Sequence, residues 1–111
     1  MGRKKINKEI KQYVIRLKRA LNPEKIVLFG SFARGDATKW SDIDLLVVAD
    51  FPKINSNKRF DILYDLHEGL IKEHDIHAYG VTPQEFKSIK QWSILNDVKK
   101  EGFVLYQKHI N

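Results

Sequence analysis

The apolar run Leu45-Leu46-Val47-Val48-Ala49 constrains the fold of this 111-residue chain more than any other segment. A strand with one face in water alternates apolar and polar side chains, because successive side chains point to opposite faces. This run does not alternate, so we expect a central strand that is covered on both faces. The length of the chain suits one modest core, which predicts a single domain over residues 1–111.

Two acidic residues lead into the predicted central strand. Asp42 and Asp44 are two residues apart, so on a strand their carboxylates face the same side, with Cβ atoms roughly 6.5 to 7 Å apart. Such a pair suits Mg²⁺, a hard cation that prefers oxygen ligands and commonly binds substrate phosphates as well. This segment therefore predicts a metal site at the start of the central strand.

A second apolar run, Ile26 to Phe29, predicts a strand that ends at a glycine and a serine. Ser31 is the expected cap of a short helix through Arg34, which Gly35 ends. The free backbone N–H groups at a helix start can bind a phosphate, and Gly30 lets the backbone approach it without a Cβ in the way. Together with the aspartate pair, this turn predicts a site for a metal-bound triphosphate.

The order Gly-Ser, ten residues, Asp-x-Asp reads GSFARGDATKWSDIDLLVV over residues 30–48. It resembles the DNA polymerase beta-like nucleotidyltransferase superfamily. The short chain and the Ala-Arg-Gly after Gly-Ser are most similar to its minimal nucleotidyltransferases, which act as antitoxin-type partners of HEPN proteins. The resemblance implies an α+β fold with a mixed four-stranded sheet backed by helices. It also implies transfer of a nucleoside monophosphate, AMP from ATP, to an acceptor hydroxyl, with two Mg²⁺ ions.

The resemblance also implies roles for individual residues. Asp42 and Asp44 would be catalytic and metal-binding, and the family has a third carboxylate on a later strand. Asp75 is the preferred candidate, because it opens an acidic Asp-Ile-His strand. A different register would place His77 there instead, a poorer ligand for Mg²⁺ than an oxygen group. The expected nucleotide-binding residues are Gly30, Ser31, Arg34 and Ser41, although Arg34 could pair with a nearby acid instead.

The whole pattern predicts the order α-β-α-β-α-β-α-β, with helices on one face of a mixed sheet and the other face open for substrate. Apolar residues three or four apart predict helices over 6–21, 60–71 and 83–98. Strands are expected over 75–81 and, at the edge, over 103–106. The chain contains no repeat or low-complexity tract, so no second domain is predicted.

Several other side chains have predicted roles. Thr82 and Glu85 form a capping-box pattern at the start of the last helix. Trp92 has helical spacing and is expected in the core. Trp40 and Tyr79 are candidates for stacking on a nucleotide base.

Two rival sites are rejected. Gly30 and Gly35 have the spacing of a P-loop, but Asp36-Ala37 stands where Lys-Ser or Lys-Thr is required. The histidines do not predict a zinc site, because His74 and His77 face opposite sides of a strand and the chain has no cysteine.

The basic charge is concentrated in the first 21 residues, where eight basic residues and one acidic residue give +7, whereas the rest of the chain carries −1. The amphipathic helix predicted there has a basic outer face, which can meet nucleic acid, an acidic partner or water alone. We see no apolar run of membrane-spanning length and no signal-peptide pattern. These observations predict a cytoplasmic protein without a membrane partner.

Three functions remain open. The leading one is an enzyme that uses ATP and Mg²⁺ to adenylylate a tyrosine of a HEPN toxin, an inference from the resemblance alone. The second is a non-catalytic nucleotide-binding module that neutralises its partner by contact, with Phe51, Phe103 and Tyr106 as candidate surface residues. The third is nucleotide addition to an RNA end, which the absence of a separate RNA-binding domain disfavours. The acceptor site is expected from another chain or from a second copy in a homo-oligomer.

Overall fold

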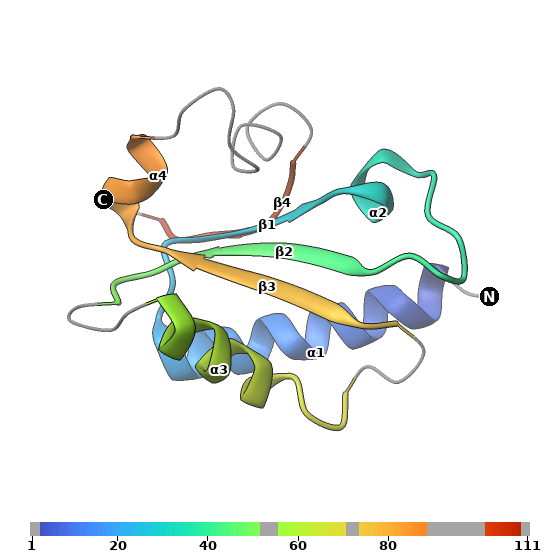
Figure 1. Cartoon of the computed structure of the whole chain (residues 1–111), viewed down its shortest axis with the longest axis horizontal. Coiled ribbons are helices and arrows are strands. Elements are labelled where there is room, and N and C mark those ends of the chain that lie inside the picture. The colour runs from blue at the N-terminus through green and yellow to red at the C-terminus, as the bar shows by residue number, and fades with distance from the viewer. Residues whose placement is uncertain (1–2, 52–55, 71–73, 89–101, 110–111) are drawn as a thin grey trace.

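Four strands form one mixed sheet in the computed structural model, which describes residues 3–51, 56–70, 74–88 and 102–109 (Figure 1). The strand order is β3-β2-β1-β4. Their bounds are β1 Lys25–Phe29, β2 Ile43–Val48, β3 Ile76–Val81 and β4 Phe103–Gln107. β2 pairs parallel with β3 and antiparallel with β1, and β1 pairs antiparallel with β4. This sheet confirms the predicted α+β fold.

The helices alternate with the strands in the predicted order. Their bounds are α1 Arg3–Leu21, α2 Ser31–Arg34, α3 Ser56–Leu66 and α4 Pro83–Lys87. α1 and α3 cover one face of the sheet, and α4 lies on the other side (Figure 1). The expectation that helices back only one face is therefore wrong. The rest of the predicted last helix, with Trp92, lies outside the described residues.

The central position of β2 explains its unbroken apolar sequence. Leu45 and Val47 face α1 and α3, whereas Leu46 and Val48 face the opposite side. All four side chains are buried. On that opposite side Phe86 of α4 packs against an apolar cluster that includes Leu46, Val48 and Val81. The non-alternating run thus correctly predicted a strand covered on both faces.

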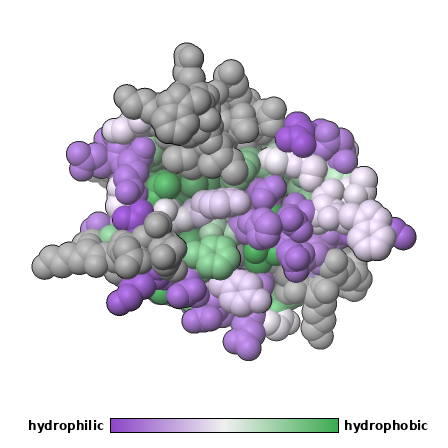
Figure 2. Space-filling model, viewed as in Figure 1, coloured by the Kyte–Doolittle hydropathy of each residue, from purple (hydrophilic) through white to green (hydrophobic). Residues whose placement is uncertain are grey.

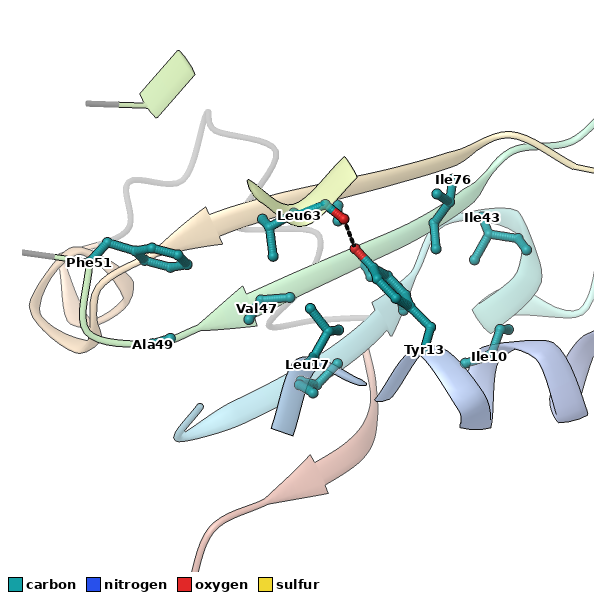
Figure 3. Packing of buried hydrophobic residues seen from close by; sticks show 12 residues of the cluster. Ile10, Tyr13, Leu17, Ile43, Val47, Ala49, Phe51, Leu63 and Ile76 are labelled. Atoms are coloured by element: carbon teal, nitrogen blue, oxygen red, sulfur yellow. Dashed lines mark hydrogen bonds between the residues drawn. The ribbon is translucent and has the colours of Figure 1, made fainter. Parts of the chain in front are cut away.

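The larger core lies between the sheet and the two long helices (Figure 3). Tyr13 is fully buried there, and its hydroxyl donates a hydrogen bond of 2.6 Å to the backbone carbonyl of Leu63. Burial raises the pKa of the Tyr13 phenol far above its usual range. Ile10 and Leu17, one turn to either side, are buried beside it. This bond joins α1 to α3 across the core, and the apolar spacing of α1 did not predict it.

The second helix departs from its predicted pattern. α3 ends at Leu66, and its aromatic residues Phe60 and Tyr64 are exposed. Phe51, in contrast, is only 2% exposed, with the Arg59 guanidinium 5.3 Å from its ring centre. The prediction of Phe51 as a surface residue for a partner is therefore wrong, because the chain turns this ring back into the core after β2.

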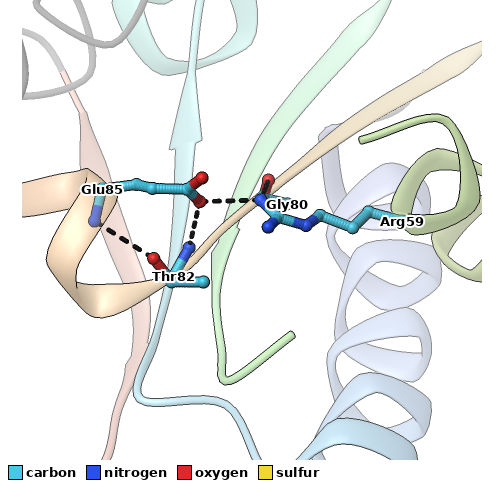
Figure 4. Close-up of polar contacts among 4 residues, drawn as sticks. All are labelled: Arg59, Gly80, Thr82 and Glu85. Atoms are coloured by element: carbon cyan, nitrogen blue, oxygen red, sulfur yellow. Dashed lines mark hydrogen bonds and ion pairs between the residues drawn. The ribbon is translucent and has the colours of Figure 1, made fainter. Parts of the chain in front are cut away.

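The predicted capping box is present at the start of α4 (Figure 4). Thr82 Oγ1 accepts a hydrogen bond from the backbone N–H of Glu85 at 3.1 Å, and Glu85 Oε1 accepts one from the Thr82 N–H at 2.7 Å. The same Glu85 oxygen pairs with Arg59 of α3 at 2.7 Å. Two helices on opposite sides of the sheet are joined by this carboxylate.

The surface is mixed in character. In the face shown in Figure 2, apolar side chains are visible near the middle, with hydrophilic ones to the left, to the right and below. Among the described helices, none combines the length and the apolar composition that crossing a bilayer would require.

Candidate functional site

The two predicted aspartates lie where β2 begins. Asp44 is in β2, on the face that carries Leu46 and Val48, and Asp42 precedes the strand by one residue. The side chain of Asp42 is 43% exposed and that of Asp44 is 24% exposed. In the sheet register, Asp44 stands between Phe29 of β1 and His77 of β3. The aspartate pair is thus open to solvent but fixed by a strand with neighbours on both sides.

The turn after β1 is packed directly against Asp44. Gly30 has φ 77° and ψ −157°, a conformation that only glycine adopts without strain. A Cβ built on Gly30 would overlap the Asp44 Oδ2 and lie 3.3 Å from its Cγ. Glycine is therefore required here for two independent reasons, its backbone conformation and the lack of space for a Cβ beside the carboxylate.

Helix α2 begins at this turn. The backbone N–H groups of Ala33 and Arg34 donate to the Gly30 carbonyl at 3.1 and 3.0 Å. The N–H groups of Ser31 and Phe32 are therefore the ones that the first turn of α2 does not use. Gly35 ends the helix with φ 85°, as its position predicted. The turn offers two backbone donors beside the aspartate pair.

The electrostatics of the aspartate pair favour a cation. Burial is the main cause that raises the pKa of Asp44, and the negative charge of Asp42 raises it further, while His77 and Arg34 oppose the shift. The pKa of Tyr79 is also raised, first by burial and then by the charges of Asp44 and Asp42. A partly desolvated pair of like charges is stabilised by a bound positive ion.

His77 is the third polar group at the pair. Its Nδ1 lies 3.7 Å from Asp42 Oδ2 and 3.9 Å from Asp44 Oδ1. Asp75 precedes β3 and is exposed, and its backbone carbonyl accepts a hydrogen bond from the Ile43 N–H at 2.9 Å. Within the described ranges, no three Asp, Glu, His or Cys side chains converge closely enough to enclose a metal ion. The role of Asp75 as a third carboxylate stays a prediction.

Two other predicted nucleotide-binding residues are engaged locally. Ser41 Oγ accepts a hydrogen bond from the Thr38 N–H at 2.8 Å, which closes the loop before β2. Arg34 Nε pairs with Asp36 Oδ2 at 3.3 Å, the alternative that its exposed position suggested. Their contacts with a nucleotide also stay predictions.

His74 supports this loop, a role that nothing in the sequence indicated. It is buried, its Nδ1 lies 2.7 Å from the Ser41 carbonyl oxygen, and its ring meets Phe32 edge-on with centroids 5.1 Å apart. The imidazole thereby connects the start of β3, the start of β2 and α2. Its contacts hold the backbone from which Asp42 projects.

The two candidates for base stacking differ in their surroundings. Trp40 is 81% exposed in the loop before β2, with Lys39 Nζ 5.0 Å from its ring centre. Tyr79 lies on β3 on the aspartate face, and its ring centroid is 6.0 Å from that of Phe29. Both rings are placed on elements that border the aspartate pair.

A cavity of about 580 Å³ opens on the α1 side of the sheet and is lined by residues of α1, β1, α2 and β4. Its lining is mostly apolar and includes Ile10, Val14, Leu28, Phe32 and Leu105, together with Lys11 and Lys39. Asp42, Asp44 and His77 do not line it. The cavity is therefore separate from the chemistry of the aspartate pair.

Comparison with known sequences gives a consistent result. A family model described as "Nucleotidyltransferase domain" matches residues 4–105. The chain is 38% identical over 103 residues to a Methanocaldococcus jannaschii protein named "Putative protein adenylyltransferase MJ0604", covering 89% of this chain and 96% of that protein. A second protein of that organism, "Putative protein adenylyltransferase MJ1305", is 39% identical over 84 residues, or 73% of this chain and 53% of its own length.

Solved structures have the same fold. A structure described as "a putative nucleotidyltransferase from Sulfolobus solfataricus" superposes with a TM-score of 0.61 at 20% identity, covering 97% of this chain and 91% of that one. A toxin–antitoxin structure with AMP-PNP superposes with a TM-score of 0.59 at 26% identity, covering 86% of this chain and 72% of that one. A MntA-HpeT toxin–antitoxin structure superposes with a TM-score of 0.61 at 24% identity, covering 89% of this chain and 72% of that one.

Proposed function

Because this chain belongs to the nucleotidyltransferase domain family, we propose that it transfers AMP from ATP to a hydroxyl group of a partner protein. In this reaction the acceptor hydroxyl loses its proton to solvent and its oxygen bonds to the α-phosphorus, while the bond from that phosphorus to the oxygen bridging to the β-phosphate breaks and pyrophosphate leaves. The relative that is 38% identical over most of both chains is named as a protein adenylyltransferase, which supports a protein acceptor. ATP as the triphosphate agrees with the AMP-PNP of the toxin–antitoxin structure.

The observation that carries the proposal is the aspartate pair with the Gly30 turn packed against it. Asp42 and Asp44 offer two carboxylates on one side of β2, and the partial burial and mutual repulsion of the pair fit a hard divalent cation. Mg²⁺ commonly uses only one or two protein carboxylates and completes its shell with water and substrate phosphates. When bound, two Mg²⁺ ions would neutralise charge on the attacking and leaving oxygens.

The other residues of the site bind and orient the nucleotide. The N–H groups of Ser31 and Phe32, which the first turn of α2 leaves without an intrahelical acceptor, can donate to a phosphate. In the proposed complex Arg34 exchanges its pairing with Asp36 for the triphosphate, and Ser41 contacts a phosphate oxygen. Positioning and electrostatic stabilisation supply most of the rate in such transfers, so these donors act by holding the α-phosphorus in line with the acceptor.

The acceptor belongs to another chain in this proposal. Solved neighbours of this fold are toxin–antitoxin complexes, which supports a toxin as partner, and the proposed acceptor is a tyrosine of a HEPN-type helical toxin. The reaction is proposed for the cytoplasm, where ATP is available. A competing function, neutralisation by contact alone, is favoured by the exposed apolar side chains of Phe103 and Val104 on the edge strand β4.

Capture of the partner from the native host tests the two functions against each other. The tagged chain is incubated with the captured proteins and ATP, and mass spectrometry locates any added AMP. We expect AMP on a partner tyrosine with the wild type and with Asp50→Asn, a matched change at the exposed aspartate after β2. Asp42→Asn with Asp44→Asn should abolish the modification. A toxin that is still neutralised by this double variant, with no AMP added by the wild type, would support contact alone.

A further inference from the structure

The cavity on the α1 side of the sheet has the size and the lining of a small-molecule site. Its volume of about 580 Å³ falls within the range of about 300 to 1,000 Å³ that such sites commonly have. The first half of α1 and α2 lie at the same end of the sheet (Figure 1), and β4 contributes to the lining. Most of the lining is apolar and comes from Ile10, Val14, Leu28, Phe32, Phe103 and Leu105. An apolar chain placed there is removed from water, which favours binding.

The charged groups that line the cavity are positive. Lys11 of α1 and Lys39 of the loop before β2 contribute them, and the described lining contains no aspartate or glutamate. Neither ammonium group forms an ion pair with a described residue, and Lys39 Nζ lies 5.0 Å from the ring centre of Trp40. His74, which also lines the cavity, is engaged by the Ser41 carbonyl oxygen, 2.7 Å from its Nδ1. The cavity therefore favours a ligand that carries a negative charge.

A small molecule suits the cavity better than a protein segment does. Thirteen described residues line it, whereas each side of a standard protein interface supplies about 20 to 30 residues. In small-molecule sites a mostly apolar lining buries the ligand, and a few polar groups fix its orientation. Here two ammonium groups can do so, because the long apolar stems of lysine side chains lie along apolar surface while their charged ends stay in water.

We propose that this cavity binds a small amphipathic anion, an apolar chain that ends in a carboxylate, taken up from solution. The chain contacts the apolar lining, and the carboxylate pairs with Lys11 and Lys39. The inference goes beyond the proposed function and does not depend on it, because Asp42 and Asp44 do not line the cavity. It assigns a second ligand to the face of the sheet opposite the one that carries Asp44.

Calorimetric titration of the full chain with three probes of equal chain length tests the choice of head group. The probes are octanoate, octan-1-ol and octylammonium, which differ in charge. We expect octanoate to bind about two- to tenfold more tightly than octan-1-ol, the range that two partly exposed ion pairs supply. Octylammonium should bind most weakly. Decanoate should bind about tenfold more tightly than octanoate, since its two additional methylene groups contact further apolar lining.

Two pairs of lysine substitutions test the position of the carboxylate. Lys11→Gln with Lys39→Gln should reduce the affinity for octanoate to that for octan-1-ol and should leave binding of octan-1-ol unchanged. Lys87→Gln with Lys108→Gln is the matched control, because it removes the same charge at exposed positions outside the cavity. We expect both affinities to be unchanged in this control.

Filling the cavity tests the position of the apolar chain. Val14→Phe on α1 and Ala37→Leu on the loop after α2 add apolar bulk from two different elements of the lining. Each should weaken binding of octanoate and of octan-1-ol by about tenfold or more, since the ligand loses the space of roughly two methylene groups. Urea midpoints establish that the variants are folded, and if one is destabilised the other decides the result.

Three results would overturn the inference: equal affinities for octanoate and octylammonium, octanoate binding that Lys11→Gln with Lys39→Gln leaves unchanged, or wild-type affinity for octanoate in the folded cavity-filling variants. Absence of octanoate and decanoate binding would also overturn it, and loss of the captured partner protein in Val14→Phe would then assign the cavity to that protein. None of these results concerns the aspartate pair, so the proposed function is tested separately.

Discussion

Replacement of Gly30 by alanine is the most informative single perturbation of this protein. The added Cβ has two separate effects. The backbone at φ 77° and ψ −157° becomes strained, and the methyl group overlaps the Asp44 carboxylate. Because Asp44 belongs to the central strand, the turn rather than the strand is expected to move.

The two effects can be given magnitudes. A non-glycine residue in this sparsely populated region costs about 1 to 3 kcal/mol, and overpacking by one methyl group costs about 1 to 3 kcal/mol. We therefore expect Gly30→Ala to lower the free energy of unfolding by about 2 to 6 kcal/mol. Gly35 has φ 85° but nothing within 4 Å of its added Cβ. Gly35→Ala should lower the free energy of unfolding only through its left-handed backbone conformation, by about 1 to 2 kcal/mol.

Urea unfolding of both variants measures the difference. The contact with Asp44 is isolated by repeating Gly30→Ala in an Asp44→Ala background, where the overlapping oxygen is absent. We expect the cost of Gly30→Ala to fall by about 1 kcal/mol or more in that background, as for contacting residues in double-mutant cycles. Equal costs in the two backgrounds would refute the argument that the turn is packed against the carboxylate.

Three further changes follow from the same structure. Tyr13→Phe should lower the free energy of unfolding by about 1 to 3 kcal/mol, because the buried Leu63 carbonyl loses its donor; urea unfolding measures it. Asp44→Asn should raise the urea midpoint at pH 7, because burial raises the pKa of Asp44 and its ionised form destabilises the fold. This advantage should shrink as the pH falls toward 3.8, the ordinary value. Glu85→Gln should lower the free energy of unfolding by about 1 kcal/mol at neutral pH. The Thr82 N–H lowers the pKa of Glu85, so wild-type stability from this group is present above pH 4.5 and is lost as the pH falls through the lowered pKa; midpoints at pH 7 and pH 4 check it.

The fold was predictable where local pattern decides the structure. The unbroken run Leu45–Ala49 predicted the central strand, and Thr82 with Glu85 predicted the helix start, because each depends on neighbours in sequence. Tyr13 was not assigned to the core. Its hydroxyl is satisfied by the Leu63 carbonyl, fifty residues away, and no local spacing indicates that partner.

The site was predictable only in part, for a related reason. Asp42 and Asp44 share a side because strand alternation fixes it, and Gly30 meets Asp44 because β1 and β2 are adjacent antiparallel strands. The place of Asp75 or His77 depends on the register of β3 against β2. A long connection joins these two parallel strands, so turn geometry does not fix that register. A shift of the β3 register by two residues would decide whether the Asp75 carboxylate or the His77 imidazole lies beside the aspartate pair.

Calorimetric binding of AMP-PNP in the presence of Mg²⁺ tests most directly the claim that the Asp42–Asp44 pair and the Gly30 turn form the nucleotide site. The account predicts binding by the wild type that requires Mg²⁺ and disappears in Asp42→Asn with Asp44→Asn. Asp50→Asn with Asp61→Asn removes the same charge at exposed positions outside the site and should retain binding. Binding of AMP-PNP by the Asp42, Asp44 double variant with wild-type affinity would contradict the assignment of the site.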